Sequence, residues 1–273
     1  MVEAAVTGCR RDIIGLVKSR TRGDFQKGLL ALLEPAPIRD AEWIHKSVSG
    51  FNLLTRKAMA REVLCTRTPA ELRAIAGAYR FRYRGDMVDD VVGAFFGKER
   101  ELFRRLLTVD RVLQADHAAA ADRDRARTLA QALYEAGPAR WGTDEGTYIQ
   151  ILTTESPDAL RAVFREFEAL YGQNLLAVMD KEFSGSFEKD MLTLSKFLID
   201  PPRAFADIIR KALTGVRTDE EDLIRAIIAR KDIDLREIME VYEAQGGSLM
   251  EDVESKTRGE FRSLLMAVIA SVA

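Results

Sequence analysis

Cysteine, histidine and long apolar runs are all scarce in this sequence, and each shortage excludes a class of protein. Two cysteines and two histidines among 273 residues build no disulfide framework, and their spacing matches no zinc motif. No apolar run approaches the ~20 residues that a membrane-spanning helix needs. No segment of useful length alternates apolar and polar residues as a half-buried strand does. With 47% apolar and 31% charged residues, the composition is that of a globular protein, and we expect an all-α fold.

An excess of charge of one sign is also missing. The formal net charge of −2 argues against a general polyanion binder, so we expect no nucleic-acid partner. His45 and His117 have no catalytic or metal-ligating companion nearby, and no P-loop, dinucleotide fingerprint or nucleophile elbow occurs. We therefore expect no enzymatic activity. Because the N-terminus shows no export signal, Cys9 and Cys65 are expected to be reduced thiols of a cytoplasmic protein.

The clearest positive signal is a helical pattern that occurs three times. Apolar residues recur at i, i+3, i+4 and i+7 in the segments 68–79, 156–167 and 235–242, as in an amphipathic helix. The first two segments open with Thr68–Pro69 and Ser156–Pro157, and such a pair is typical of an N-cap followed by proline in the first turn. We therefore expect each segment to be a helix that buries one face.

A second repeated element is a glycine followed by an apolar helix. Gly23, Gly97, Gly185 and Gly259 lie 74, 88 and 74 residues apart. Glycine at such a place marks where one helix ends and the next begins at an angle. The repeating unit is therefore about 74 residues long, and 14 additional residues separate the second unit from the third.

These periods divide the chain into units of short helices. Residues 1–34 supply only the second half of a first unit. Complete units are expected at 37–109, 124–199 and 201–273, with a helical or flexible linker at 110–123. Units of this size bury little surface alone, so we expect them to pack on each other.

The third unit contains a candidate site for a hard cation. A glycine-bounded loop begins at Gly137 and opens into a helix near Glu145, and Glu182 follows Gly142 by forty residues. Calcium takes about seven oxygens and accepts backbone carbonyls beside a bidentate carboxylate. A helical hairpin that folds back on itself can bring such a loop and this carboxylate onto one ion. The alternative is an ordinary helix–helix turn followed by an acidic helix start, which the helix dipole favours.

The repeat period, the Gly-Thr-Asp-Glu loop, the acid forty residues later and the long linker together resemble the annexin family over essentially the whole chain. Residues Arg140–Glu145 read Arg-Trp-Gly-Thr-Asp-Glu, which is similar to the third repeat of an annexin. The resemblance, divergent and also similar to the alpha-giardins, implies an array of five-helix repeats of about 70 residues that form a curved disc. It also implies that the first repeat is only half present.

The resemblance further implies a Ca²⁺ site on the convex face of the third repeat. Its ligands are the carbonyl oxygens of Gly137, Arg140 and Gly142 and the carboxylate of Glu182, completed by waters or a phospholipid phosphate. Trp141 lies at the tip of this loop, where an exposed tryptophan suits the bilayer interface. Core packing is the alternative role for this side chain.

The other repeats depart from this pattern. In the second repeat, Leu54 replaces the loop glycine and Ala94 replaces the acid. In the fourth repeat, Arg217 replaces the loop glycine and Lys256 replaces the acid. We expect neither repeat to bind calcium in this way. The segment Thr218–Glu221 still predicts a capping box at a helix start.

Three cations occupy slots of the calcium pattern in the first and fourth repeats. Arg20 stands at the acid position of the partial first repeat, as Lys256 does in the fourth, and Arg217 replaces a loop glycine. Fixed cations at these places can contact anionic lipid without calcium. Decay of the loops into ordinary solvated surface is the alternative interpretation.

The sequence thus predicts a non-enzymatic protein that binds anionic phospholipid membranes peripherally from the cytoplasm, with Ca²⁺ held by the third repeat. The alternative is a structural scaffold similar to the giardins, which associates with the cytoskeleton or with itself and binds calcium weakly. Intact Gly142 and Glu182 favour the first prediction. The degraded slots in the other repeats favour the second.

Overall fold

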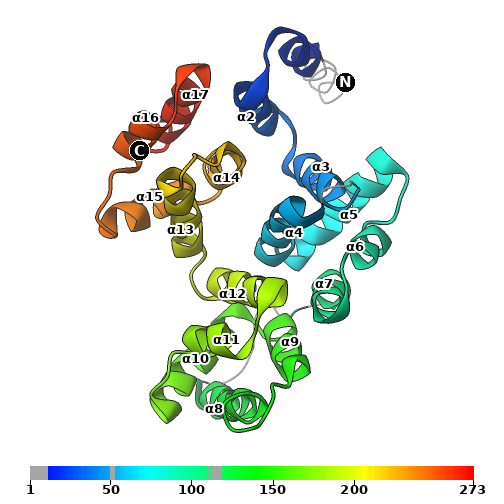
Figure 1. The fold of residues 1–273 in the computed structure, drawn as a ribbon, viewed down its shortest axis with the longest axis vertical. Helices are drawn as coiled ribbons and strands as arrows, with labels where there is room; N and C mark the ends of the chain where they lie inside the picture. The colour runs from blue at the N-terminus through cyan, green and yellow to red at the C-terminus, as the bar shows by residue number, and fades with distance from the viewer. Residues whose placement is uncertain (1–11, 50–52, 110, 112–118) are drawn as a thin grey trace. The chain divides into compact units, whose positions relative to one another are not determined.

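The computed structural model describes residues 12–49, 53–109, 111 and 119–273, and the described elements are helices joined by short turns (Figure 1). No strand occurs among these residues. The prediction of an all-α fold is confirmed. None of the described helices combines the length and apolar content that crossing a bilayer requires.

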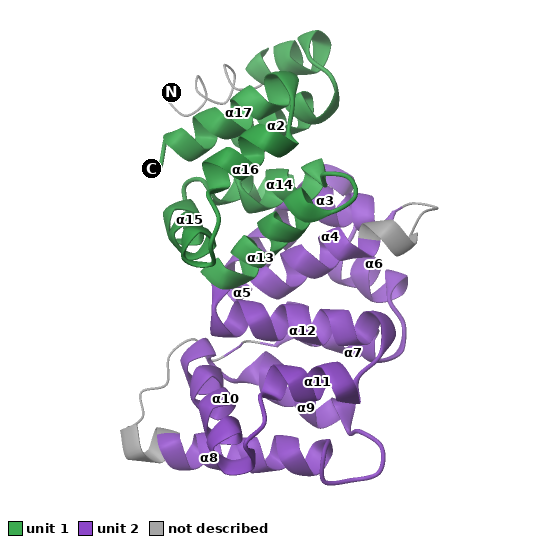
Figure 2. Cartoon of the chain, turned by 60° about the vertical axis from the view of Figure 1, so that its left-hand side comes forward, with its two compact units in different colours: residues 1–39, 202–273 green, residues 40–201 purple. Residues whose placement is uncertain are grey.

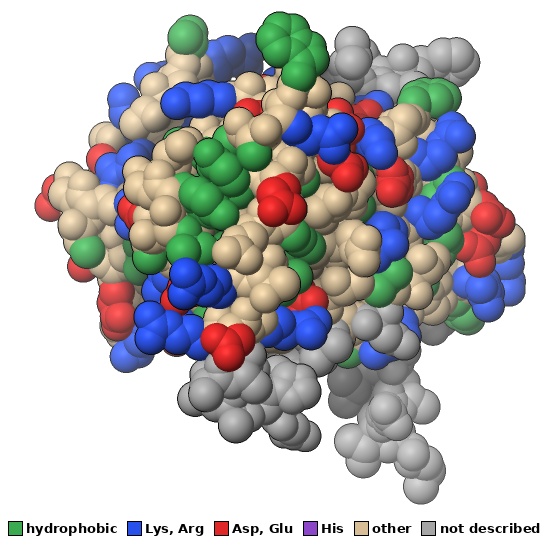
Figure 3. Space-filling model, turned by 90° about the horizontal axis from the view of Figure 1, so that it is seen from below, with side chains coloured by type: hydrophobic (Ala, Val, Ile, Leu, Met, Phe, Trp, Pro, Cys, Tyr) green, Lys and Arg blue, Asp and Glu red, His purple; other side chains and the backbone are tan. Residues whose placement is uncertain are grey.

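The chain forms two compact units (Figure 2). Unit 1 comprises residues 1–39 and 202–273, and unit 2 comprises residues 40–201. Unit 1 therefore joins the beginning of the chain to its end, while unit 2 holds the candidate loop and Glu182. On the face drawn in Figure 3, basic and acidic side chains are interspersed, with apolar side chains among them.

The helices of unit 2 follow one another in two similar runs. The first run is α3 (Ala36–Val48), which begins just before the unit boundary, α4 (Leu53–Thr66), α5 (Pro69–Tyr83), α6 (Met87–Ala94) and α7 (Gly97–Thr108). The second run is α8 (Ala119–Ala136), α9 (Glu145–Thr154), α10 (Pro157–Tyr171), α11 (Leu175–Glu182) and α12 (Gly185–Ile199). Unit 1 contains helical residues 12–20, α2 (Gly23–Leu33), α13 (Pro201–Thr214), which begins at the unit boundary, α14 (Glu220–Ala226), the 3₁₀ turn η1 (Ile228–Arg230), α15 (Leu235–Ala244), α16 (Leu249–Lys256) and α17 (Gly259–Ala270).

The three predicted amphipathic stripes are confirmed as buried helix faces. In α5 the buried side chains are Leu72, Ile75 and Tyr79, and the matching positions of α10 and α15 are buried as well. Thr68 caps α5 through a complete capping box, and Ser156 caps α10 by accepting the amide of the third helical residue. The 3.6-residue period of the apolar positions thus sets which face enters the core.

The repeated glycines place the helix that follows each of them. Gly23, Gly97, Gly185 and Gly259 are each the first residue of a helix and have φ values of 63°, 55°, 71° and 60°. These values lie in the left-handed region, where a side chain is strained and glycine is not. Each glycine therefore turns the chain sharply between a short helix and a long one.

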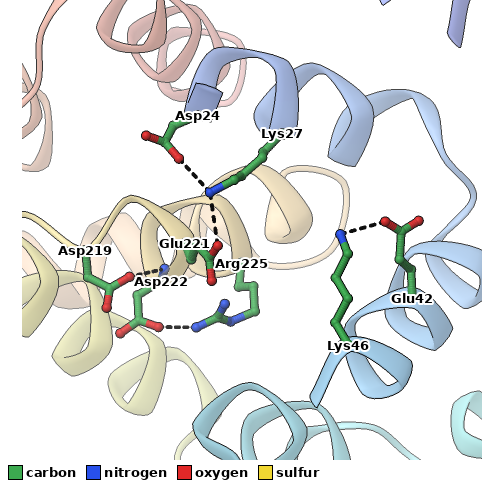
Figure 4. A network of polar contacts seen from close by, with 8 residues as sticks. All are labelled: Asp24, Lys27, Glu42, Lys46, Asp219, Glu221, Asp222 and Arg225. Atoms are coloured by element: carbon green, nitrogen blue, oxygen red, sulfur yellow. Dashed lines mark hydrogen bonds and ion pairs between the residues drawn. The ribbon is translucent and has the colours of Figure 1, made fainter. Parts of the chain in front are cut away.

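One hydrophobic core connects both runs of unit 2. Helix α12 of the second run packs against α4 and α7 of the first, so the two runs share buried side chains. Helix α2 is tied into unit 1 similarly, because it packs against α14, η1 and α17. Lys27 of α2 lies 2.9 Å from Asp24 Oδ1 and 3.0 Å from Glu221 Oε1 of α14 (Figure 4).

Candidate functional site

The candidate loop connects α8 to α9 and is closed by its own backbone. The amide of Asp144 donates to the carbonyl of Ala136 at 2.7 Å, which joins the two ends of the loop. Within it, the amide of Arg140 donates to the carbonyl of Gly137 at 3.1 Å. These bonds fix a tight turn whose remaining carbonyl groups are not consumed by a helix.

Glycine is required at both ends of this turn, for different reasons. Gly142 has φ +79°, a backbone conformation that a side chain makes strained. Gly137 lies against the side chain of Tyr148, where an added Cβ would come within 2.6 Å of the Tyr148 hydroxyl. The same added atom would lie 3.6 Å from the carboxyl carbon of Glu182. The absence of a side chain at Gly137 therefore leaves room between the loop backbone and this carboxylate.

Glu182 is the last residue of α11 and faces the loop. Its Oε2 atom accepts a hydrogen bond from the hydroxyl of Thr143 at 2.6 Å. The chain then becomes extended at Phe183 and turns at Gly185 into α12. The carboxylate is half-buried, so solvent or an ion can reach it while Thr143 holds its orientation.

A buried tyrosine forms the floor of the site. The Tyr148 hydroxyl donates to the carbonyl of Leu133 at 2.9 Å, and its ring meets Phe183 edge-on, with the centroids 5.0 Å apart. Burial raises the pKa of Tyr148, and the negative charge of Glu182 raises it further. Tyr148 is therefore a neutral, fixed support beneath Glu182.

The acidic residue that follows the loop has a different task. Asp144 caps α9, because its carboxylate accepts from the hydroxyl of Thr147 at 3.0 Å and from the amide of Gly146 at 3.1 Å. The bonds from Thr147 and Gly146 hold the pKa of Asp144 below its usual value. The interpretation as an acidic helix start is thus correct for Asp144, while Glu182 is left free of this role.

The donor set fits calcium better than other common metals. Among the described residues, no cluster of three or more His, Cys, Asp or Glu side chains could hold an ion, so a metal here would rely on carbonyl oxygens. Each carbonyl has two lone pairs, so Gly137 can accept the Arg140 amide and still face an ion. Mixed carbonyl and carboxylate oxygen is the set that Ca²⁺ accepts, whereas Mg²⁺ demands compact octahedral geometry.

A family model described as Annexin matches residues 39–106, 129–194 and 204–268. The chain belongs to the annexin family. Annexin A13 of Mus musculus is 35% identical over 260 residues, which cover 95% of this chain and 80% of that protein. The solved structure of annexin III has a TM-score of 0.87 at 28% identity and covers 94% of this chain and 78% of that chain. Alpha-14 giardin, with a TM-score of 0.78 at 21% identity, shares the fold.

Membership in this family has consequences for the protein. Annexins as a family bind calcium and, with it, anionic phospholipid membranes, to which they attach peripherally. They are generally binding proteins and not enzymes. The repeat array and the helical fold are those of an annexin.

The loop tip of the third annexin repeat points into solvent. Trp141 is 102% exposed, so core packing is excluded as its role. Val216, at the tip of the corresponding loop of the fourth repeat, is 108% exposed. Both loops thus present an apolar side chain that contacts little of the protein.

The fourth repeat keeps the scaffold of the site but not its chemistry. The amide of Asp219 donates to the carbonyl of Ala212 at 3.1 Å, as Asp144 does in the third repeat. The hydroxyl of Thr218 donates to the carbonyl of Lys256 at 3.0 Å. Lys256 therefore occupies the position that Glu182 has in the third repeat.

One prediction for the fourth repeat was wrong. The helix cap is not Thr218 but Asp219, whose side chain accepts the amide of Asp222. The hydroxyl of Thr218 is engaged with Lys256 instead, and Glu221 pairs with Lys27. The role of Thr143 in holding Glu182 was missed, although Thr recurs at 143 and 218 in the two loops.

The remaining predicted positions are less informative about calcium. Arg20, Arg217 and Lys256 are all exposed. Ala94 ends α6 and offers no ligand oxygen from its side chain. The loop of the second repeat at 50–52, with the side chain of Leu54, lies outside the described residues.

Proposed function

We propose that this annexin binds anionic phospholipid membranes in a calcium-dependent manner through its third repeat. The carbonyl oxygens of Gly137, Arg140 and Gly142 and the carboxylate of Glu182 would hold the ion. The observation that carries the proposal is that Glu182 faces the loop and is oriented there by Thr143 at 2.6 Å.

The charge balance of this site favours a shared ligand on the membrane. When bound, calcium would keep net positive charge, because a single carboxylate neutralises only part of it, and a lipid phosphate can complete its coordination. Trp141, fully exposed beside the site, would enter the interfacial region, where tryptophan is favoured. The lipid-binding surface would therefore combine an ionic contact, between calcium and a lipid phosphate, with an apolar contact made by Trp141.

Three cations in unit 1 supply a second, calcium-independent contribution. Arg20, Arg217 and Lys256 are exposed, and each cation near an anionic surface contributes about 1 kcal/mol. Their share falls with rising salt, since exposed charges are screened. We place the protein at the cytoplasmic face of membranes, bound peripherally and without enzymatic activity.

Cosedimentation with phosphatidylserine vesicles, across a calcium titration, tests the proposed site. Glu182→Gln removes the anionic ligand but keeps the size of the side chain, so binding should require much more calcium. Glu168→Gln, at an exposed position of α10, is the matched control and should behave as wild type. An unchanged calcium midpoint for Glu182→Gln, with wild-type helicity, would refute the third-repeat site.

A further inference from the structure

At each of the four glycine junctions, the side chain of the residue before the glycine makes no hydrogen bond to the start of the helix that follows. In each junction the residue before the glycine is extended and occupies the N-cap position, yet its side chain makes no capping hydrogen bond. These residues are Arg22, Phe96, Ser184 and Arg258. The chemistry of this position can therefore vary without loss of the turn, because the glycine alone fixes the geometry.

The second and third repeats differ at this junction in a consistent direction. Counted from Gly185, the third repeat has Glu182 three residues before and Glu188 three residues after. Counted from Gly97, the second repeat has Ala94 and Arg100 at the same positions. An acid that faces the candidate calcium loop and a second acid in the first turn of α12 are thus replaced by a methyl group and a cation.

The residues closest to the glycine change in the same sense. Ser184 and Ser186 flank Gly185 in the third repeat, whereas Phe96 and Lys98 flank Gly97 in the second. An aromatic ring and a cation thus replace two hydroxyl groups. The junction of the second repeat has lost what calcium needs and has gained what an anionic lipid surface attracts.

The aromatic ring stands on a rigid base. Phe96 is 65% exposed, although its neighbour Phe95 is buried against Phe103 with ring centroids 4.4 Å apart. The guanidinium of Arg100 lies 5.2 Å from the centre of the Phe96 ring, and its Nε donates to the carbonyl of Phe95 at 2.8 Å. The exposed ring is therefore held by packing beneath it and by a cation beside it.

Part of the positive charge at this junction is available to a ligand. Among the described residues Arg100 has no carboxylate partner, whereas Lys98 pairs with Glu101 at 3.1 Å on the open surface. A pair this exposed contributes little and is easily exchanged for another anion.

This junction lies beside the calcium loop of the third repeat. The ammonium of Lys98 lies 3.8 Å from the place where a Cβ of Gly146 would be. Gly146 is in the first turn of α9, directly after the loop that carries Trp141. Because α7 packs on α9, Phe96 and the candidate calcium site belong to one side of unit 2.

We propose that Phe96, Lys98 and Arg100 form a second contact of unit 2 with anionic phospholipid, made without calcium. The ring enters the interfacial region of the bilayer and the two cations meet the headgroup phosphates. A bilayer is the partner because Lys98 lies beside the start of α9, which follows the loop that carries Trp141, and because Lys98 and Arg100 have the charge opposite to anionic lipid while Phe96 is an exposed aromatic ring. This inference rests on the proposed membrane-binding function and adds a contact to it.

The contact is measured directly with a tryptophan placed at the junction. Phe96→Trp, combined with Trp141→Phe, is mixed with phosphatidylserine vesicles whose acyl chains are brominated and therefore quench a tryptophan that enters the interface. Phe81→Trp in the same background is the control, because Phe81 is 78% exposed near the end of α5, before α6 begins, whereas Phe96 follows the end of α6. Calcium-bound protein should show quenching at position 96 and not at position 81.

Affinity gives the second measurement. Phe96→Ser introduces the residue that the third repeat itself has at this position, so the fold should tolerate it, and it should weaken vesicle binding while Phe81→Ser does not. Lys98→Gln should weaken binding about fivefold at low salt, the equivalent of about 1 kcal/mol for one cation. Both losses should persist in a Glu182→Gln background.

The outcomes separate this contact from the calcium site. If Glu182→Gln abolishes binding but position 96 is unquenched on vesicle-bound protein, the calcium site stands and the second contact is refuted. If Glu182→Gln is without effect but position 96 is quenched, the second contact stands and the calcium site is refuted. Absence of any vesicle binding by the wild-type protein, with and without calcium, would overturn both.

Discussion

A buried pair of carboxyl groups gives the sharpest prediction for stability. Asp190 of α12 is fully buried, and its Oδ1 accepts from Nε of Arg61 on α4. Glu99 of α7 is also buried, with Lys57 3.5 Å from its Oε2. The second oxygen of each acid, Oδ2 of Asp190 and Oε1 of Glu99, has no hydrogen-bond partner. Two acids that face each other in a dry interior cannot both stay ionised at low cost.

The magnitude follows from the pKa of Asp190. Burial raises this pKa from 3.8 to about 7, and the charge of Glu99 adds to the rise while Arg61 opposes it. In the unfolded chain the same group loses its proton near 3.8. Between these two values the native state holds the additional proton, so stability falls as pH rises through the window. Across the whole window this proton lowers the free energy of unfolding by about 4 kcal/mol as pH rises, and about 3 kcal/mol of that change falls above pH 5.

Asp190→Asn removes this dependence while preserving the shape of the side chain. The amide oxygen still accepts from Arg61, and the amide nitrogen donates to Glu99 in every state. We expect the free energy of unfolding of the variant, minus that of wild type, to increase by about 3 kcal/mol between pH 5 and pH 8. The variant should therefore gain most where wild type must bury a second negative charge.

Urea titrations followed by tryptophan fluorescence measure this difference in unit 2 alone. The only two tryptophans, Trp43 and Trp141, both lie in residues 40–201, and Trp43 packs against the core. Asp158→Asn is the matched control, because that side chain is 83% exposed, and its difference from wild type should not vary with pH. A difference for Asp190→Asn that is constant from pH 5 to pH 8 would refute the account of the pair.

Three further predictions concern the site and unit 1. Gly137→Ala should destabilise the protein by about 1–3 kcal/mol in thermal or urea unfolding, because its Cβ would meet the Tyr148 hydroxyl at 2.6 Å; unchanged stability would contradict this packing. Thr143→Val removes the 2.6 Å hydrogen bond to Glu182 and should raise the calcium needed for vesicle binding, whereas Thr143→Ser should not. Lys27→Met removes two ion pairs on the open surface and should cost less than about 1 kcal/mol in urea unfolding; a larger loss would show that α2 depends on these pairs.

The sequence predicted most securely what depends on local periodicity. The stripe Leu72, Ile75 and Tyr79 was predicted as a buried helix face and is one, because the helical period alone brings these residues together. The glycine junctions were also predicted, since the left-handed conformation selects glycine.

Local pattern was less informative where several residues compete for one role. Thr218 and Asp219 are both good N-cap residues, and the sequence does not show that the hydroxyl of Thr218 is used by Lys256 across the loop. Asp219 is therefore the N-cap of α14, because the tertiary contact with Lys256 engages the hydroxyl of Thr218.

Contacts between two repeats could not be predicted from the sequence. Asp190 and Glu99 are 91 residues apart and meet only because α12 packs on α7. The exposure of Phe96 beside buried Phe95 also depends on how α6 and α7 pack. The forty-residue spacing between Gly142 and Glu182 identified the loop and the carboxylate from the sequence. That they bind calcium together remains a prediction.

The glycine turns have a consequence for how such a protein can change over time. Because the backbone, and not the residue three positions earlier, sets the turn, that residue can be an acid, a methyl group or a cation while the helices stay in place. In each repeat the side chain at this position can therefore be replaced without a change in how the surrounding helices pack. An ion-dependent attachment can therefore be lost from one repeat, or turned into a direct ionic one, by a few single substitutions that the rest of the protein scarcely feels.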